Sequence, residues 1–205
     1  MQTFTDITAL RAELSAQRHR GHRLAFVPTL GNLHAGHAHL VEAAQQQADK
    51  RVVSIFVNPL QFGANEDYAL YPRTLDADAR LLESLGTDYL FAPALTEMYP
   101  PTQATGAQEL VQALSDILCG AFRPQHFSGV ATVVAKLLNI VQPEVALFGE
   151  KDYQQLLVIR SLVATLNFLV QIIGVETVRA PDGLALSSRN HYLTAEEREQ
   201  APELI

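Results

Sequence analysis

Residues 24–48 read LAFVPTLGNLHAGHAHLVEAAQQQA, and this stretch decides the fold class. The apolar residues 24–27 have the length and composition of a buried strand. A turn containing Gly31-Asn32 follows, and apolar residues then recur at helical spacing over 36–48. A strand that leads directly into a helix is typical of a βαβ unit, and such units predict a parallel sheet.

The same alternation continues on both sides of this stretch. Further strands are expected at 52–57, 89–92, 145–148 and 169–175, and further helices at 7–18, 74–85, 129–141 and 152–167. The turn-rich segment 93–105 is expected to be a surface loop. Another helix is expected to begin at Thr194, with Glu196 and Glu197 in its first turn. These elements predict an α/β fold whose sheet is covered by helices on both faces.

The composition excludes several classes of protein. The chain has 205 residues, of which 48% are hydrophobic and 18% charged, as in a globular domain with a full core. Its net charge of -7 argues against nucleic acid as the main partner, because phosphate backbones bind basic faces. The sequence has no apolar run long enough to span a membrane and no signal-peptide pattern. The single cysteine, Cys119, excludes a disulfide framework, and we expect a cytoplasmic protein.

The first candidate site is the segment 28–37, PTLGNLHAGH, between the first strand and its helix. Parallel sheets bind ligands at the carboxyl ends of their strands, and a helix N-terminus attracts phosphate. His34 and His37 are three residues apart, so both could donate to a phosphate as its charge develops. Two other interpretations stay open: surface histidines, or a cap and a packed ring. A metal site that includes His39 lacks an obvious further ligand.

The second candidate site is the segment 148–155, FGEKDYQQ, also at a strand end that enters a helix. Asp152 is a candidate N-cap for that helix. Lys151, one of three lysines, has the compact charge that suits a phosphate ligand. The alternative is a solvated loop in which Lys151 pairs with Glu150.

The third candidate site is the segment 182–190, DGLALSSRN. The hydroxyls of Ser187 and Ser188 and the guanidinium of Arg189 could hold and neutralise a polyphosphate. The alternative is an ordinary serine-rich turn.

A polar pair, Asn58 and Gln61, follows the strand at 52–57. Amides at this edge of the sheet could hold the hydroxyl groups or the carboxylate of a small substrate. The alternative is that Asn58 caps the loop before Pro59. The nearby segment 71–74, YPRT, is expected to close onto a helix N-cap at Thr74.

In this order and spacing, the segments resemble the pantothenate synthetase (pantoate–β-alanine ligase) family. The resemblance covers 24–193 and includes PTLGNLHAGH, SIFVNPLQF, YPRTL, RPQHFSGV, NIVQPEVALFGEKDYQQL and DGLALSSRN. It implies a Rossmann-like fold of the class I synthetase-like nucleotidyltransferase type, with an HxGH motif at 34–37 and the counterpart of the KMSKS loop at 186–189. It also implies a catalytic domain at 1–190 that binds ATP and pantoate. Residues 191–205 would then begin a truncated C-terminal region. Family members continue into a lid domain that this chain lacks, so its own synthetic activity is expected to be impaired.

The reaction implied by the resemblance is the ATP-dependent ligation of (R)-pantoate and β-alanine. It passes through pantoyl adenylate and releases pyrophosphate and AMP, with Mg²⁺ accompanying ATP. The implied partners are these small molecules and a second copy of the chain in a homodimer, with no nucleic acid and no membrane. Another nucleotidyltransferase of the superfamily would keep His34 and His37, but would have no reason to keep the Asn58/Gln61 and Lys151/Gln155 set together. A catalytically silent nucleotide-binding or scaffold protein is disfavoured because His37, Lys151 and Arg189 are retained.

The resemblance assigns roles to the residues that match the family's motifs. The residues implied to bind ATP are Leu30, Gly31, Asn32, Leu33, His34, Ala35, Gly36, His37, Gly149, Glu150, Lys151, Asp152, Val178, Leu186, Ser187, Ser188 and Arg189. Those implied in catalysis are His34, His37, Lys151, Ser187, Ser188 and Arg189. Those implied to bind pantoate and β-alanine are Asn58, Gln61, Arg123, His126 and Gln155. No residue is implied as a metal ligand.

The chain departs from the family's usual pattern at three positions. Leu30 stands where methionine is usual, and a backbone contact there would survive the change. Cys119 stands where glutamate is common, which puts a polar contact in doubt. Gln125 stands where glycine is frequent.

Overall fold

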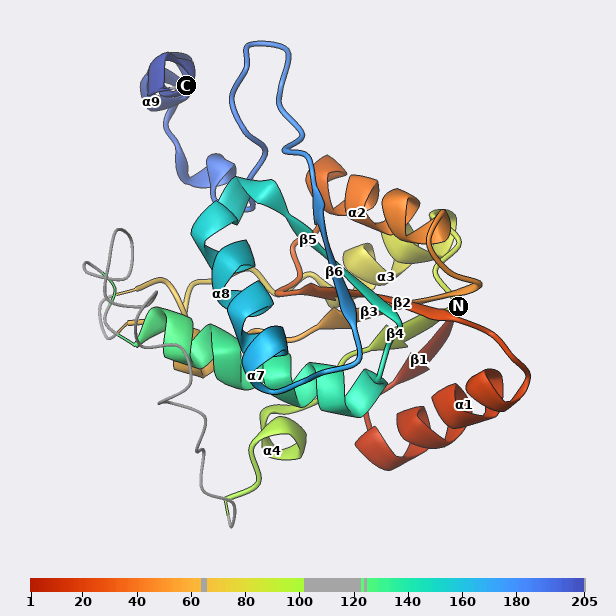
Figure 1. Ribbon diagram of the computed structural model, residues 1–205. Helices are drawn as coiled ribbons and strands as arrows, with labels where there is room; N and C mark the ends of the chain where they lie inside the picture. The colour runs from red at the N-terminus through yellow and green to blue at the C-terminus, as the bar shows by residue number, and fades with distance from the viewer. Residues whose placement is uncertain (64–65, 102–122, 124, 205) are drawn as a thin grey trace.

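The computed structural model of the chain describes residues 1–63, 66–101, 123 and 125–204 (Figure 1). Cys119 and the end of the predicted loop, 102–105, lie outside the described residues. The described strands form one parallel sheet in the order β1-β4-β3-β2-β5-β6, which confirms the predicted α/β class. No described helix combines the length and the apolar character needed to cross a bilayer.

The sheet places the ends of two central strands beside each other. Its strands are β1 (Gln2–Phe4), β2 (Leu24–Thr29), β3 (Lys50–Ile55), β4 (Tyr89–Phe91), β5 (Val145–Gly149) and β6 (Gln171–Val175). β2 pairs with β3 on one side and with β5 on the other. The chain leaves β2 toward β3 and later returns to β5, so the strand order reverses between β2 and β5. Open α/β sheets bind ligands at the carboxyl ends of the strands at such a point.

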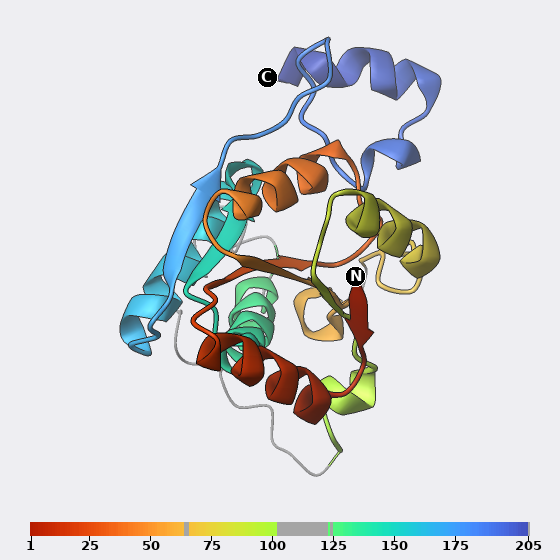
Figure 2. The same cartoon turned by 90° about the vertical axis from the view of Figure 1, so that its right-hand side faces the viewer.

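Each face of the sheet has its own hydrophobic core. Along β2, Leu24 and Phe26 belong to one core, whereas Ala25 and Val27 belong to the other, because successive strand residues point to opposite faces. The helices of the first face are α1 (Ile7–His19), α7 (His126–Val141) and α8 (Tyr153–Thr165), and those of the second are α2 (Ala35–Gln45) and α3 (Leu75–Ser84) (Figure 2).

Short elements complete the described chain. They are the one-turn helix α4 (Leu95–Met98), the 3₁₀ helices η1 (Pro59–Gln61), η2 (Glu150–Asp152), η3 (Asn190–Tyr192) and η4 (Ala201–Leu204), and α9 (Ala195–Gln200). α4 lies inside the segment predicted as a loop, and the side chain of Met98 is fully buried there. β1 was not predicted at all. Thr194 forms a capping box with Glu197 at the start of α9, which confirms the predicted helix start.

Candidate active site

A cavity of about 250 Å³ opens at the carboxyl ends of β2 and β5, where the predicted motifs meet. The predicted residues that line it are Leu30, His34, Gly36, His37, Gln61, Arg123, His126, Gly149, Lys151, Asp152, Gln155, Val178, Leu186, Ser187, Ser188 and Arg189. The predicted residues that do not line it are Gly31, Asn32, Leu33, Ala35, Glu150 and Asn58. The cavity therefore unites segments that are far apart in sequence.

The two histidines of the first motif start helix α2. The Nδ1 atom of His34, the N-cap, accepts a hydrogen bond from the backbone N–H of Gly36 at 3.1 Å. The Nδ1 atom of His37 accepts one from the backbone N–H of His34 at 3.2 Å. A backbone N–H can only donate, so each neutral ring carries its proton on Nε2. The interpretation of His34 as a helix cap is thus confirmed, and the Nε2–H groups of both histidines remain available as donors.

Both histidines are held in the neutral form. Burial lowers the pKa of His34, and the nearby charge of Lys151 lowers it further. Burial, followed by His34 and Lys151, lowers the pKa of His37 to about 3. Neutral Nε2–H donors suit a phosphate whose charge increases during a reaction, and they need no protonation at physiological pH.

We expect nuclear magnetic resonance to show His37 as a neutral Nε2–H tautomer from pH 8 down to about 4. The unfolded chain binds a proton near pH 6.5 that folded His37 does not bind until about pH 3. Stability should therefore fall as the pH drops through this window. The His37→Asn variant assigns the signal and should have a smaller acid-induced loss of stability. A His37 ring that titrates near pH 6.5 in the folded protein would contradict this arrangement.

The turn before these histidines is tied to helix α3. Gly31 and Asn32 have φ angles of 85° and 52°, as the predicted tight turn requires. The buried carboxylate of Asp78 accepts hydrogen bonds from the backbone N–H groups of Asn32 and Leu33, both at 2.9 Å. These N–H groups are therefore engaged by Asp78, and neither Asn32 nor Leu33 lines the cavity. Sequence reasoning missed Asp78, which reads as an ordinary acidic residue in the first turn of a helix.

Lys151 projects from the turn between β5 and α8. Its Nζ atom lies 3.1 Å from Oδ2 and 3.2 Å from Oδ1 of Asp152, so the suggested pairing with Glu150 is wrong. Asp152 occupies the N-cap position of α8, but its side chain makes no cap hydrogen bond, so the predicted capping role is also wrong. Glu150 does not line the cavity, and its side chain lies against Gly174 of β6.

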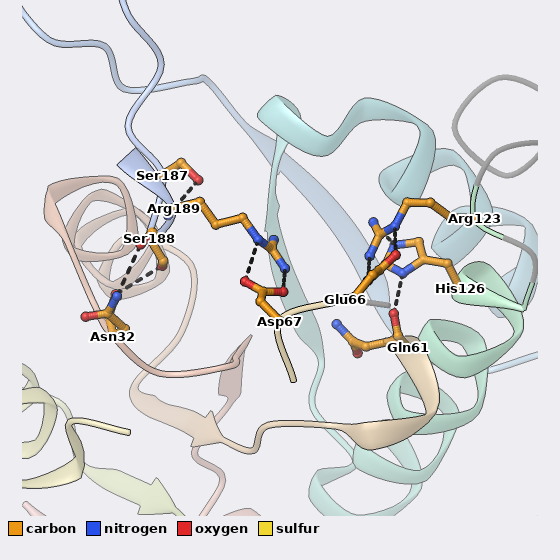
Figure 3. Close-up of polar contacts among 9 residues, drawn as sticks. All are labelled: Asn32, Gln61, Glu66, Asp67, Arg123, His126, Ser187, Ser188 and Arg189. Carbon is orange, nitrogen blue, oxygen red and sulfur yellow. Dashed lines mark hydrogen bonds and ion pairs between the residues drawn. The ribbon is translucent and has the colours of Figure 1, made fainter. Parts of the chain in front are cut away.

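The third motif docks on the first. The hydroxyl of Ser188 donates to the backbone carbonyl of Asn32 at 3.1 Å, and the side-chain amide of Asn32 donates to the Ser188 carbonyl at 3.3 Å (Figure 3). The Ser187 hydroxyl oxygen accepts from the backbone N–H of Arg189 at 3.2 Å, which leaves its hydrogen for donation. The motif is therefore fixed in place by Asn32, whose role is to hold the two motifs together.

The guanidinium of Arg189 is paired with Asp67 through two hydrogen bonds. Nε lies 3.0 Å from Oδ2, and Nη2 lies 2.7 Å from Oδ1. The hydrogen bonds from Arg189 lower the pKa of the Asp67 carboxyl. Arg189 also lies over the ring of Tyr71, 5.8 Å from its centroid.

Gln61 lines the cavity, whereas Asn58 is fully buried behind it. The Oδ1 atom of Asn58 accepts from the backbone N–H of Leu60 and from the hydroxyl of Tyr99. Its Nδ2 atom donates to the Gly129 carbonyl and to Oε1 of Gln61, both at 3.1 Å. The predicted substrate contact of Asn58 is therefore corrected, since its side chain caps the loop and orients Gln61. Because Oε1 of Gln61 accepts from Asn58, the orientation of the amide is fixed, and its nitrogen remains a donor for a ligand.

Arg123 and His126 line the cavity next to Gln61. The two oxygens of Glu66 accept from Nε and Nη2 of Arg123 at 2.6 and 2.5 Å (Figure 3). His126 contacts Nη1 of Arg123 at 3.1 Å and the Gln61 carbonyl at 2.7 Å. Gln125, which precedes α7, has a φ angle of 71°, and this left-handed conformation explains why glycine suits the position.

Sequence reasoning missed much of the cavity wall. Its apolar part comes from the inner face of α7, and the residues missed there are Val130, Val133, Val134 and Leu137. The other lining residues that received no role are Leu40, Phe56, Phe62, Tyr71, Leu147, Glu176 and Thr177, together with Pro28, Thr29 and Phe148, which lie inside the candidate segments 28–37 and 148–155. An apolar helix face gives the same sequence signal whether it faces the core or a cavity, so only the fold distinguishes the two. Within the part of the chain that the structure describes, no group of three or more His, Cys, Asp or Glu side chains is arranged to hold a metal ion.

Comparison with known proteins identifies the family. The profile described as pantoate-beta-alanine ligase matches residues 2–205. A pantothenate synthetase from Pseudomonas putida is 60% identical over 202 residues, which cover 98% of this chain and 70% of that protein.

Solved structures agree with this comparison. A pantothenate synthetase from Thermus thermophilus superimposes with a TM-score of 0.93 at 53% identity, over 98% of this chain and 71% of that one. A pantoate-beta-alanine ligase from Francisella tularensis, complexed with beta-gamma ATP and beta-alanine, superimposes with a TM-score of 0.92 at 40% identity. The match covers 100% of this chain and 77% of that one. The chain therefore belongs to the pantoate–β-alanine ligase family.

Proposed function

We propose that this protein joins (R)-pantoate to β-alanine at the expense of ATP, through a pantoyl adenylate intermediate. One observation carries the proposal. A single cavity brings the neutral donors His34 and His37, the cations Lys151 and Arg189, and the oriented amide of Gln61 to one sheet edge. The first four suit a polyphosphate, and the last suits the oxygens of a small hydroxy acid. The relative from Francisella tularensis, in complex with beta-gamma ATP and beta-alanine, supports the choice of substrates.

In the first proposed step, a carboxylate oxygen of pantoate attacks the α-phosphorus of ATP. A bond forms between them, the bond to the bridging oxygen breaks, and pyrophosphate leaves with the electron pair. A carboxylate is already anionic at pH 7, so the step needs no general base. The work of the protein is then to orient the reactants and to stabilise charge on the leaving pyrophosphate, which we assign to His37, Lys151 and Arg189.

In the second proposed step, the amine of β-alanine attacks the acyl carbon of the adenylate. The C–N bond of pantothenate forms, the C–O bond to phosphate breaks, and AMP leaves. The amine must lose a proton in this step. We place pantoate against Gln61 and Gln155, with Arg123 and His126 beside Gln61, because all four line the cavity and His126 contacts both Arg123 and the Gln61 carbonyl.

The remaining proposals concern Mg²⁺ and assembly. We propose that Mg²⁺ enters with ATP, because this ion keeps much of its water and binds mainly through phosphate oxygens in such sites. We also propose a homodimer, as the family resemblance implies.

The reaction is tested by isotope exchange. We expect radiolabelled pyrophosphate to exchange into ATP when pantoate and Mg²⁺ are the only additions. Exchange should stop when pantoate is omitted, and it should not need β-alanine. Exchange without pantoate, or exchange that requires β-alanine, would contradict the two-step scheme.

A further inference from the structure

We propose that Glu66 and Asp67, neighbours on the loop after η1, are positioning residues for the two halves of the site. Glu66 fixes the half that holds pantoate at Gln61, and Asp67 fixes the half that holds ATP at Arg189. The inference rests on the proposed function for the identity of the two ligands. Its structural basis is a pair of ion pairs that Figure 3 shows side by side, with the two arginines approaching from opposite sides.

Neither carboxylate lines the cavity, whereas both of their arginine partners do. Glu66 and Asp67 are partly buried, with side-chain exposures of 25% and 21%. An arginine side chain is flexible, but it is restricted to few rotamers when its Nε and Nη2 groups both donate to one carboxylate. The carboxylates therefore act on a ligand through the arginines that they hold.

Each carboxylate begins a chain of contacts, which we call its arm. The Glu66 arm consists of Glu66, Arg123 and His126, and it ends on the main chain of Gln61. Glu66 engages Nε and Nη2 of Arg123, which leaves Nη1 to contact Nε2 of His126 at 3.1 Å. A guanidinium can only donate, so Nε2 of His126 is the acceptor, and the ring proton sits on Nδ1. That Nδ1–H donates to the Gln61 carbonyl at 2.7 Å. A carbonyl oxygen can only accept, so this contact also requires the proton on Nδ1, and both contacts of the ring indicate the same tautomer.

The Asp67 arm is shorter. Asp67 holds Nε and Nη2 of Arg189, and Nη1 is the remaining edge of the guanidinium. The ring of Tyr71 supports the guanidinium at 5.8 Å. Among the described residues, no hydrogen bond or ion pair links the Asp67 side to Gln61 or the Glu66 side to Arg189, and Glu66 acts on Arg189 only through its charge. The two carboxylates should therefore act mainly on different ligands.

The two isosteric variants Glu66→Gln and Asp67→Asn test this division. Glu66→Gln should raise the dissociation constant and KM for pantoate about fivefold, and Asp67→Asn should raise those for ATP about fivefold, as expected for partly exposed ion pairs. In each variant, the dissociation constant and KM for the other ligand should stay within about twofold of the wild-type values. Calorimetric titration of each ligand and the exchange assay supply the two readouts.

Two further variants calibrate the measurement. Asp88→Asn weakens the ion pairs with Lys50 and Arg51, whose members do not line the cavity, and should change neither constant. Gln61→Ala removes the amide itself and should weaken pantoate binding more than Glu66→Gln does.

A loss of pantoate binding in one variant and of ATP binding in the other would distinguish positioning residues from residues that only stabilise the fold. Equal losses for both ligands in both variants would overturn the proposal, as would unchanged constants. Tighter ATP binding in Asp67→Asn would also overturn it, because Asp67 would then compete with ATP for Arg189. A wild-type protein that binds ATP but not pantoate would refute the proposed reaction, whereas the Asp67 arm would still be judged by ATP binding.

Discussion

Replacing Lys151 with alanine is expected to lower the rate of pantoate-dependent pyrophosphate exchange about 10²–10³-fold, with the fold intact. Lys151 lies at the carboxyl end of β5, and its charge depresses the pKa of both His34 and His37. A cation whose charge acts on two neutral donors is placed to stabilise charge on a leaving pyrophosphate. The loss should therefore appear in kcat more than in KM.

The same loss is expected for His37, for a different chemical reason. Alanine at this position removes both the Nε2–H donor and the Nδ1 acceptor that receives the His34 backbone N–H. His37→Asn offers an amide oxygen in place of Nδ1 and lacks the donor at the Nε2 position. Both variants should lose about 10²–10³-fold in rate, since the Nε2–H donor is the shared loss.

Lys50→Ala supplies the matched control for Lys151. Lys50 pairs with Asp88 and does not line the cavity, so its removal deletes a lysine without touching the site. Its exchange rate should match that of the wild type. A change below about threefold in the Lys151 or His37 variants would remove that residue from its assigned role.

The fold was largely predictable because its signals are local. Four of the five predicted strands overlap largely buried strands of the sheet, with β3 at Lys50–Ile55 rather than 52–57, since a parallel sheet covered on both faces needs continuous apolar runs. The fifth, β6, begins at Gln171 rather than at residue 169, and Leu169 is 98% exposed. β1 has only three residues, of which only Phe4 is buried, so its pairing with β4 leaves almost no pattern in the sequence.

The site was predictable as a set of motifs, but their contacts were not. Which residues line the cavity follows from their place at strand ends, and this placed His37, Lys151 and Arg189 on its wall. The partners of these residues come from elsewhere in the chain. Asp78 reaches the first motif across 46 residues, and Asp67 reaches Arg189 across 122. A carboxylate on a helix or a loop carries no sign of such a partner in the sequence, because only the folded chain brings the two together.

Asn58 shows how a correct motif can carry a wrong role. Its amide type and its position after β3 suit a substrate contact, and both features are also what a buried bracing residue needs. The difference lies in burial: Asn58 is fully buried, and its contacts include Tyr99, Gly129 and Gln61. Burial of this kind depends on how closely α7 approaches η1.

That approach makes Gly129→Ala the variant with the largest expected effect on the architecture of the site. A Cβ atom on Gly129 would lie 2.0 Å from the carbonyl oxygen of Leu60, 2.4 Å from its carbonyl carbon and 2.7 Å from the backbone nitrogen of Gln61. All three are backbone atoms, so no side-chain rotation relieves the overlap. Helix α7 and η1 must separate, and Gln61 must move with η1.

Two effects oppose each other in this variant, and their sizes decide the outcome. Alanine favours a helix interior over glycine by up to about 1 kcal/mol. Overpacking costs about 1–3 kcal/mol or more, and contact with rigid backbone lies at the upper end of that range. We therefore expect a net loss of about 2 kcal/mol or more, which lowers the melting temperature by roughly 4–8 °C in a domain of this size. Pantoate binding should weaken far more than ATP binding, because η1 carries Gln61 and none of the phosphate-binding motifs.

Gly149→Ala, whose Cβ would meet nothing within 4 Å, serves as the control for stability alone. A Gly129→Ala protein that is more stable than the wild type, or that binds pantoate equally well, would show that α7 and η1 are not locked together as the structure has them.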